Sequence, residues 1–214
     1  MPKLELILVR HGETDWNKGS YFRGTEDVKL NAVGVAQADL VAEVLKGRVF
    51  DAIYSSPLKR ATVTARRIAL PHEIAVREKA DFTDLNFGVW QGKTEEAVKV
   101  MHPKLYERWL TKPWGVKFLA GEKVKKAWKR VNSGLREILF MHGTGCVVIV
   151  SHRIPIKFMT TYLLKKPKKE FYKVVHDPCA ISIFEFDDRS NCKPIVLNDS
   201  RHLASLHLEG SRDF

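Results

Sequence analysis

The sequence predicts an α/β fold, a three-layer α/β/α sandwich built around a mainly parallel sheet. Apolar stretches of strand length alternate along the chain with stretches of helical periodicity, which is the pattern of repeated β–α–β units. The stretches 4–9 and 146–150 are nearly continuous runs of apolar residues, typical of strands buried on both faces. With 214 residues, the chain is long enough for one complete core. We therefore expect a single domain over residues 1–214.

The strand candidates are short apolar segments bounded by turn residues. In chain order we expect strands at 4–9, 50–54, 73–76, 146–150, 180–186 and 194–197. Helices are expected at 31–46, 56–69, 93–101, from 103 onward as a short helix, at 121–142 and at 154–164. Asn31 and Thr94 are expected N-caps, because their side-chain oxygens can accept from the first-turn amides. Ser56 is expected to cap its helix in the same way, with Pro57 at the first helical position.

The composition limits the kind of protein and of partner. The formal net charge is +11, which fits either a solvated basic surface or the attraction of anionic substrates. Lys and Arg are spread along the chain without a recognisable nucleic-acid motif, so we expect no nucleic-acid partner. Met1-Pro2-Lys3 runs directly into the first strand, and no apolar run approaches the roughly 20 residues of a membrane span. We expect a cytoplasmic protein without a membrane partner.

The cysteines do not suggest a metal site or a disulfide framework. The three cysteines, Cys146, Cys179 and Cys192, are scattered, and no pair has the spacing of metal ligands. We interpret them as free thiols in a reducing compartment. No metal and no cofactor is predicted.

Two of the predicted strands end in histidine, at Arg10-His11 and at Ser151-His152. Carboxyl ends of parallel strands share one edge of the sheet, where open α/β sheets bind their ligands. If these strands are neighbours, His11 and His152 meet across one pocket. The helix that follows Ser56 opens on the same edge and brings Arg60 towards it. Arginines, histidines and helix N-termini together indicate a phosphate site.

An ordered set of motifs resembles the histidine phosphatase superfamily, which includes the cofactor-dependent phosphoglycerate mutases. The main matches are 10–14 (Arg-His-Gly-Glu-Thr) with Trp16-Asn17, Leu30-Asn31 with Gly34 and Gln37-Ala38, 55–61 (Ser-Ser-Pro-Leu-Lys-Arg-Ala), Phe87-Gly88 with Trp90 and Gly92, and 150–152 (Val-Ser-His). Gly121-Glu122, Cys179-Ala180 and 197–199 (Leu-Asn-Asp) resemble the branch of small metal-independent phosphatases, such as phosphoserine and α-ribazole phosphatases.

The resemblance implies roles that the chemistry can explain. His11 would be the nucleophile and form a phosphohistidine. Arg10 and Arg60 would hold the non-bridging oxygens of the phosphoryl group, and His152 would add charge there as a cation. Asn17 would donate its side-chain amide to the phosphate. Arginine and histidine would thus supply what Mg²⁺ supplies in other phosphoryl-transfer enzymes.

The sequence departs from the family pattern at three positions near this site. Asp84 stands where the family has a glutamate proton donor, and we assign it that role, with Asp81 and Glu13 as weaker candidates. Arg153 replaces a common glycine after the second histidine, and Arg23 replaces a common glutamine before Gly24. Arg153 is either a salt-bridge residue at a helix start or a contact to a second acidic group of the substrate. We place Arg23, Gly24 and Arg153 among the substrate-binding residues.

We predict a metal-independent phosphatase that hydrolyses a small-molecule phosphate monoester through His11. Two alternatives use the same residues: a phosphoglycerate mutase, and a phospho-ligand-binding protein with weakened catalysis. The aromatic region 93–120 is expected to be a substrate-shaping insertion, or else to pack on the sheet or a partner. Residues 199–214 are expected to be a C-terminal tail. The predicted partner is a small phosphorylated metabolite, whose identity the sequence does not define, and a homodimer is the expected assembly because two-fold homodimers are the commonest.

Overall fold

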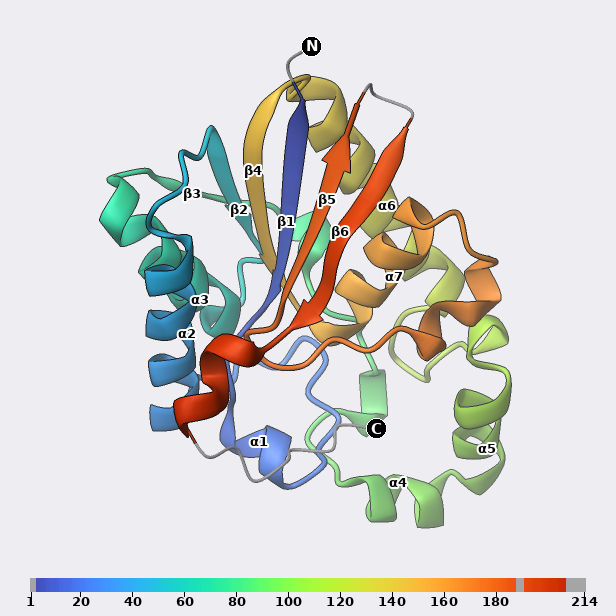
Figure 1. Cartoon of the computed structure of the whole chain (residues 1–214). Coiled ribbons are helices and arrows are strands. Elements are labelled where there is room, and N and C mark those ends of the chain that lie inside the picture. Colours follow the sequence, from blue (N-terminus) through green and yellow to red (C-terminus); the bar gives the residue numbers. More distant parts are fainter. Residues whose placement is uncertain (1–2, 188–190, 207–214) are drawn as a thin grey trace.

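A computed structural model describes residues 3–187 and 191–206. One six-stranded sheet runs through the molecule in the order β3-β2-β4-β1-β5-β6 (Figure 1). The strands are β1 (Leu4–Arg10), β2 (Ala52–Ser55), β3 (Val76–Glu78), β4 (Gly145–Ser151), β5 (Ile181–Phe186) and β6 (Cys192–Asp199). Strands β3, β2, β4 and β1 are mutually parallel, and β5 pairs antiparallel with both β1 and β6. The expected mainly parallel sheet is confirmed.

Helices cover both faces of the sheet, as expected for a three-layer sandwich. The helices are α1 (Asp15–Lys18), α2 (Ala32–Leu45), α3 (Lys59–Ala69), α4 (Glu95–Met101), α5 (Pro103–Thr111), α6 (Val124–Met141) and α7 (Arg153–Leu163). Helices α2 and α3 lie on one face and α6 and α7 on the other, while α1, α4 and α5 lie beyond the carboxyl end of β1 (Figure 1). No helix in the described ranges is long and apolar enough to cross a bilayer.

Successive side chains of β1 point to opposite faces of the sheet and pack in different halves of the core. Ile7 and Val9 pack in a cluster with residues of α2 and α3, whereas Leu6 and Leu8 pack in a cluster with residues of α6 and α7. All four side chains are fully buried. Successive strand residues point to opposite faces, so a strand covered on both faces must be apolar throughout. This explains why β1 and β4 are the most apolar segments of the chain.

Two predicted N-caps are confirmed and one is wrong. The side chains of Asn31 and Thr94 accept bonds from the amides of Gly34 and Ala97 and cap α2 and α4. Helix α3, however, begins at Lys59 after Leu58, so Ser56 is not its cap and Pro57 is not its first residue. The hydroxyl of Ser56 is used elsewhere, because it lies 2.7 Å from Nε2 of His152.

Two other boundaries differ from the prediction. Strand β3 lies at 76–78 rather than 73–76, because Glu73 has a φ of 53° that ends the preceding turn and pairing with β2 starts opposite Val76. Helix α6 starts at Val124 rather than at residue 121, because Phe118 and Glu122 close a turn through their backbone.

A close approach of two glycines fixes the loop after β1 against α2. A β-carbon on Gly12 would lie 2.3 Å from the carbonyl oxygen of Gly34, and one on Gly34 would lie 2.0 Å from the carbonyl oxygen of Glu13. No side chain fits at such distances, so glycine is required at both positions. The loop that carries His11 is therefore held by direct backbone contact with a rigid helix.

Candidate active site

The two histidines emerge side by side from neighbouring strands. Parallel pairing places Arg10 of β1 opposite Ser151 of β4, and the amide of His11 donates to the carbonyl of Ser151 over 2.9 Å. Each histidine is the next residue after its strand, so both side chains reach the same edge of the sheet. Their ring centroids lie 5.1 Å apart. The predicted meeting of His11 and His152 is therefore present.

The ring of His11 has the protonation state that a nucleophile needs. Its Nδ1 lies 2.7 Å from the carbonyl oxygen of Gly12, and since a carbonyl only accepts, we place the proton on Nδ1. The lone pair then lies on Nε2. Burial and the nearby guanidinium groups of Arg60 and Arg10 hold the pKa of His11 well below its usual value of 6.5. The imidazole is neutral at neutral pH.

His152 is also neutral in this structure, and its predicted role as a cation at the transferring phosphoryl group stays a prediction. Nε of Arg60 donates to its Nδ1 over 3.2 Å, so that nitrogen carries no proton, and Nε2 is left to donate to the hydroxyl of Ser56. Burial, followed by the charge of Arg60, lowers the pKa of His152 well below 6.5. A ring that accepts from an arginine while buried cannot easily gain a proton.

The guanidinium of Arg60 is held by several partners at once. Besides His152, its guanidinium donates to the carbonyl oxygens of Glu26 and Gly24 over 2.6 and 2.7 Å. Its Nη2 lies 3.8 Å from Oδ2 of Asp84. Burial lowers the pKa of Arg60 to about 10, so it remains charged at neutral pH. The carbonyl of Gly24 thus orients Arg60, and the predicted contact of Gly24 with substrate stays a prediction.

Arg10 and Asn17 are held by the loops around the site. Nη1 of Arg10 donates to the carbonyl of His176 over 2.8 Å. Oδ1 of Asn17 accepts from both the amide and the hydroxyl of Thr14, each over 2.8 Å. The side-chain amide of Asn17 is therefore its donating end, as its predicted role requires.

Asp84 is the carboxylate that fits a proton donor. Its side chain is buried, and burial raises its pKa above the ordinary value while Arg60 opposes that rise. The weaker candidates have other partners: Glu13 accepts from Asn31 over 2.8 Å, and Asp81 lies 3.2 Å from Nζ of Lys79. A carboxyl group with a raised pKa keeps its proton for longer as the pH rises.

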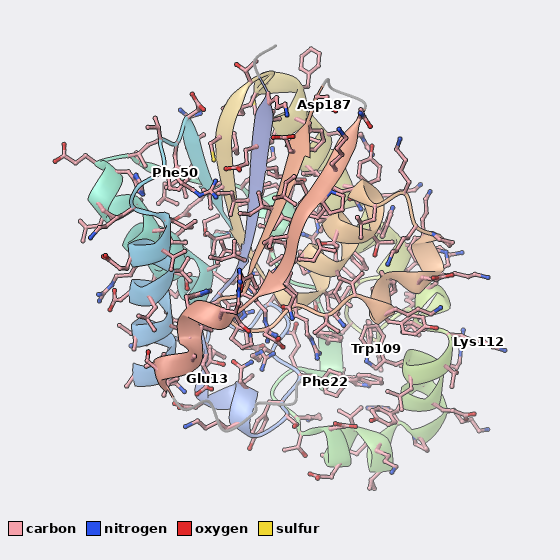
Figure 2. All side chains as sticks on the ribbon, in the orientation of Figure 1. Glu13, Phe22, Phe50, Trp109, Lys112 and Asp187 are labelled. Atoms are coloured by element: carbon pink, nitrogen blue, oxygen red, sulfur yellow. The ribbon has the colours of Figure 1, made fainter. Side chains whose placement is uncertain are left out.

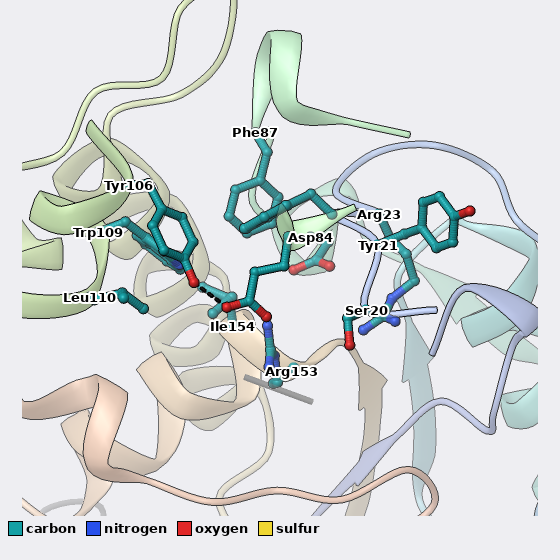
Figure 3. A pocket seen from close by; sticks show the side chains of 12 residues that line it. Ser20, Tyr21, Arg23, Asp84, Phe87, Tyr106, Trp109, Leu110, Arg153 and Ile154 are labelled. Carbon is teal, nitrogen blue, oxygen red and sulfur yellow. Dashed lines mark hydrogen bonds between the residues drawn. The ribbon is translucent and has the colours of Figure 1, made fainter. Parts of the chain in front are cut away.

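A hollow opens beside Asp84. Its lining includes Arg23 and Arg153 together with Tyr106 and Trp109 of α5. Figure 3 shows Tyr106 and Trp109 on one wall, Arg23 on the opposite wall and Asp84 between them. The region 93–120 thus contributes aromatic side chains to the hollow, and it also packs inward, since Trp109 lies against Phe118 with centroids 5.4 Å apart.

Sequence reasoning missed three contributions to the site. Ser56 was interpreted as a helix cap, although its motif was noticed, and it contacts His152 instead. Glu95 lines the hollow and accepts from the hydroxyl of Tyr106. The backbone carbonyls that orient Arg10 and Arg60 had no sequence signal at all, because any residue supplies a carbonyl.

The site holds no obvious set of metal ligands. Within residues 3–187 and 191–206, no group of three or more His, Cys, Asp and Glu side chains is arranged to hold a metal ion. The polar groups near the carboxyl ends of β1 and β4 include imidazoles, guanidiniums and the buried carboxyl of Asp84. Fold and site together define an α/β protein with a cationic, histidine-lined anion pocket.

The chain belongs to the histidine phosphatase superfamily, branch 1, whose family description matches residues 6–199. A relative of nearly equal length is phosphoserine phosphatase 1 of Hydrogenobacter thermophilus, 33% identical over 98% of this chain and 99% of the relative. Phosphoglycerate mutase-like protein 4 of Arabidopsis thaliana is 30% identical over 93% of this chain and 86% of the relative.

Solved structures agree with this assignment. A phosphoserine phosphatase variant of Entamoeba histolytica, in complex with phosphoserine, aligns with a TM-score of 0.83 at 30% identity, covering 94% of this chain and 99% of that one. A mycobacterial glucosyl-3-phosphoglycerate phosphatase aligns with a TM-score of 0.84 at 25% identity, covering 92% and 100%. The predicted family and the predicted phosphoric monoester hydrolase activity on small molecules are confirmed.

Proposed function

We propose that this protein hydrolyses a small acidic phosphate monoester, without a metal ion, through a phosphohistidine on His11. The observation that carries the proposal is the pair of neutral, buried imidazoles 5.1 Å apart, one of which bonds Arg60. A neutral imidazole with its lone pair on Nε2 can attack phosphorus. The surrounding cations can stabilise the charge on the transferring group.

The phosphoryl oxygens would be held by Arg10, Arg60 and the amide of Asn17. Guanidinium groups bind phosphoryl oxygens in a fixed, bidentate geometry. Both arginines are anchored to backbone carbonyls, so little reorganisation is needed when the substrate binds. A bound phosphate dianion would favour protonation of His152, which would then donate to it as a cation.

In the first step, Nε2 of His11 forms a bond to phosphorus as the bond from phosphorus to the ester oxygen breaks. Protonated Asp84 gives its proton to that oxygen, and the alcohol leaves. In the second step, the Asp84 carboxylate removes a proton from water while the water oxygen bonds to phosphorus. The bond to His11 then breaks, phosphate leaves, and both residues return to their initial states.

Arg23 and Arg153 support an acidic substrate. Both line the hollow beside Asp84, where the alcohol part of a bound ester would lie. A carboxylate on that alcohol would bind there, since arginine pairs with carboxylates in two parallel hydrogen bonds. The relatives from Entamoeba histolytica were solved with phosphoserine and with 3-phosphoglyceric acid, two phosphate esters that carry a carboxylate.

Trapping the phosphoenzyme tests the proposed function. Wild type is mixed with p-nitrophenyl phosphate in excess chelator, quenched in alkali, digested and examined by mass spectrometry. We expect hydrolysis, together with one added phosphoryl group on the peptide that contains His11. His11→Ala should show neither, while His142→Ala, a histidine bonded to Tyr54 and outside the site, should behave as wild type. Normal turnover by His11→Ala would overturn the proposal.

The remaining expectations are proposals with separate tests. We propose a homodimer, which light scattering after size-exclusion chromatography would test, and a cytoplasmic location. The location is supported by the free cysteines Cys146, Cys179 and Cys192, because thiols persist in reducing compartments. Residues 93–120 are proposed to shape the substrate site, and of the proposed tail, residues 207–214 lie outside the described residues.

A further inference from the structure

Two further hollows lie next to the hollow beside Asp84, along α5. Trp109, Leu110 and Ile154 line both this hollow and a second one. Pro113 and Tyr172 line both the second hollow and a third. The three hollows are therefore neighbours that extend outward from Asp84, and we refer to them together as the depression. The third hollow lies between the end of α5 and the 3₁₀ helix η5 (Lys168–Lys173).

We call this third hollow the outer groove and define it by Arg108, Lys112, Trp114, Lys169, Tyr172 and Lys173. Its charge is strongly one-sided, since its lining holds four cations and a single carboxylate, that of Glu170. Glu170 lies 3.3 Å from Nζ of Lys173 and so offsets one of the four. Within the described parts of the chain, Arg108, Lys112 and Lys169 have no carboxylate oxygen within 4.0 Å.

These cations are exposed and gathered from two separate elements. Arg108 belongs to α5 and Lys112 follows it, whereas Lys169 and Lys173 belong to η5. Figure 2 shows Lys112 at the outer edge of the molecule. Like charges brought together on one surface repel each other, so such a cluster favours binding of an anion. Trp114 and Tyr172 add flat apolar surface between the charges.

We propose that the outer groove binds a second phosphate group at the far end of an extended substrate. The reacting phosphate would lie at His11, the body of the alcohol would follow the depression past Trp109, and the distal phosphate would meet the lysines. The inference rests on the proposed function, because it takes the reacting phosphate at His11 as the other end of the same substrate. It adds that small multi-anionic phosphate esters, such as bisphosphates, are preferred over esters with one phosphate.

The test uses bisphosphates of increasing chain length to find the spacing between the two phosphates that the protein prefers. Propane-, hexane- and decanediol bisphosphates are compared with the monophosphates of the same diols, and kcat/KM is measured for release of the first phosphate. We expect wild type to prefer the bisphosphate by about tenfold at the length that spans the depression. The preference should fall as salt is added, because exposed charges are screened.

Two triple variants distinguish an effect of the groove lysines from an effect of the protein's net charge. Each variant loses three positive charges. Lys112→Ala, Lys169→Ala and Lys173→Ala remove three groove lysines, whereas Lys99→Ala, Lys126→Ala and Lys129→Ala remove exposed lysines that do not line the depression. The groove triple should lose the preference and the control triple should keep it. Both should hydrolyse p-nitrophenyl phosphate within about twofold of wild type. No preference at any length in wild type, or equal loss in both triples, would overturn the inference.

Binding measured by calorimetry tests the groove even if the proposed hydrolytic function fails. If wild type hydrolyses none of the esters, the proposed function fails, and binding of the hexanediol and decanediol bisphosphates is then measured directly. Binding that is weakened about tenfold in the groove triple alone would support the groove. Equal binding by wild type and both triples would overturn it.

Discussion

The phosphate site and the outer groove are both cationic, but they are built in opposite ways. At the phosphate site the guanidiniums are buried and each donates to a backbone carbonyl, as Arg10 does to His176 and Arg60 to Gly24 and Glu26. In the outer groove the lysines are exposed and lie on or next to short helices. A fixed cation can stabilise a transition state, whereas an exposed one mainly attracts and selects ligands.

The comparison predicts that substitution of the buried cations causes the largest losses of catalytic activity. Arg60→Ala should lower kcat/KM about 10²- to 10³-fold on any phosphate ester, because a charge-stabilising donor is lost. Arg60→Lys should also be poor, since one ammonium cannot serve His152 and both carbonyls at the distances observed.

Arg66→Ala is the matched control for Arg60, because Arg66 lies on the same helix with an exposed side chain that pairs only loosely with Glu78 at 3.8 Å. It should leave steady-state kinetics unchanged. Circular dichroism establishes that each variant is folded. Wild-type kinetics in folded Arg60→Ala would remove Arg60 from the phosphate site.

The second effect concerns proton donation and depends on the leaving group. Asp84→Asn should slow hydrolysis of alkyl phosphates about 10²-fold but that of p-nitrophenyl phosphate much less, since nitrophenolate leaves without a proton. Asp81→Asn, at a carboxylate that pairs with Lys79, should change neither rate. Equal slowing of both substrates by Asp84→Asn would show that Asp84 is not the donor.

A smaller effect is expected at the inner edge of the hollow. Arg153→Gly should lower kcat/KM for phosphoglycolate about tenfold and leave ethyl phosphate nearly unchanged, because only the former carries a carboxylate for Arg153 to bind. The two substrates have similar alkyl leaving groups, so their ratio isolates the carboxylate. A uniform loss on both would favour a purely structural role for Arg153.

The smallest effect is on stability. The folded-state pKa values of His11 and His152 lie well below 6.5, so below that pH the unfolded chain binds more protons than the folded one. The stability that these residues contribute is therefore full above pH 6.5 and is lost as the pH falls.

Calorimetric melting between pH 7.5 and 4.5 measures this effect. The melting temperature of wild type should fall more over that interval than that of a folded His152→Asn variant. The variant lacks one of the two histidines whose pKa is lowered in the folded state. Parallel curves for the two proteins would mean that His152 titrates alike in the folded and unfolded states.

Most of the fold and the centre of the site could be predicted from local pattern. Six strands and the caps at Asn31 and Thr94 followed from apolar runs and from side chains that act on their own neighbours. The boundaries of β3 and α3 could not be predicted, because pairing with β2 and the use of Ser56 by His152 depend on distant residues.

The sequence by itself determined that two histidines follow buried strands and that arginines accompany them, because residue types and their order are local facts. Only the tertiary structure decided their chemical state. Arg60 donates to His152 across 92 positions of sequence, and burial keeps both imidazoles neutral and raises the pKa of Asp84. Protonation is set by charge, solvent exclusion and hydrogen-bond partners, and these exist only once segments far apart in the chain have been packed together.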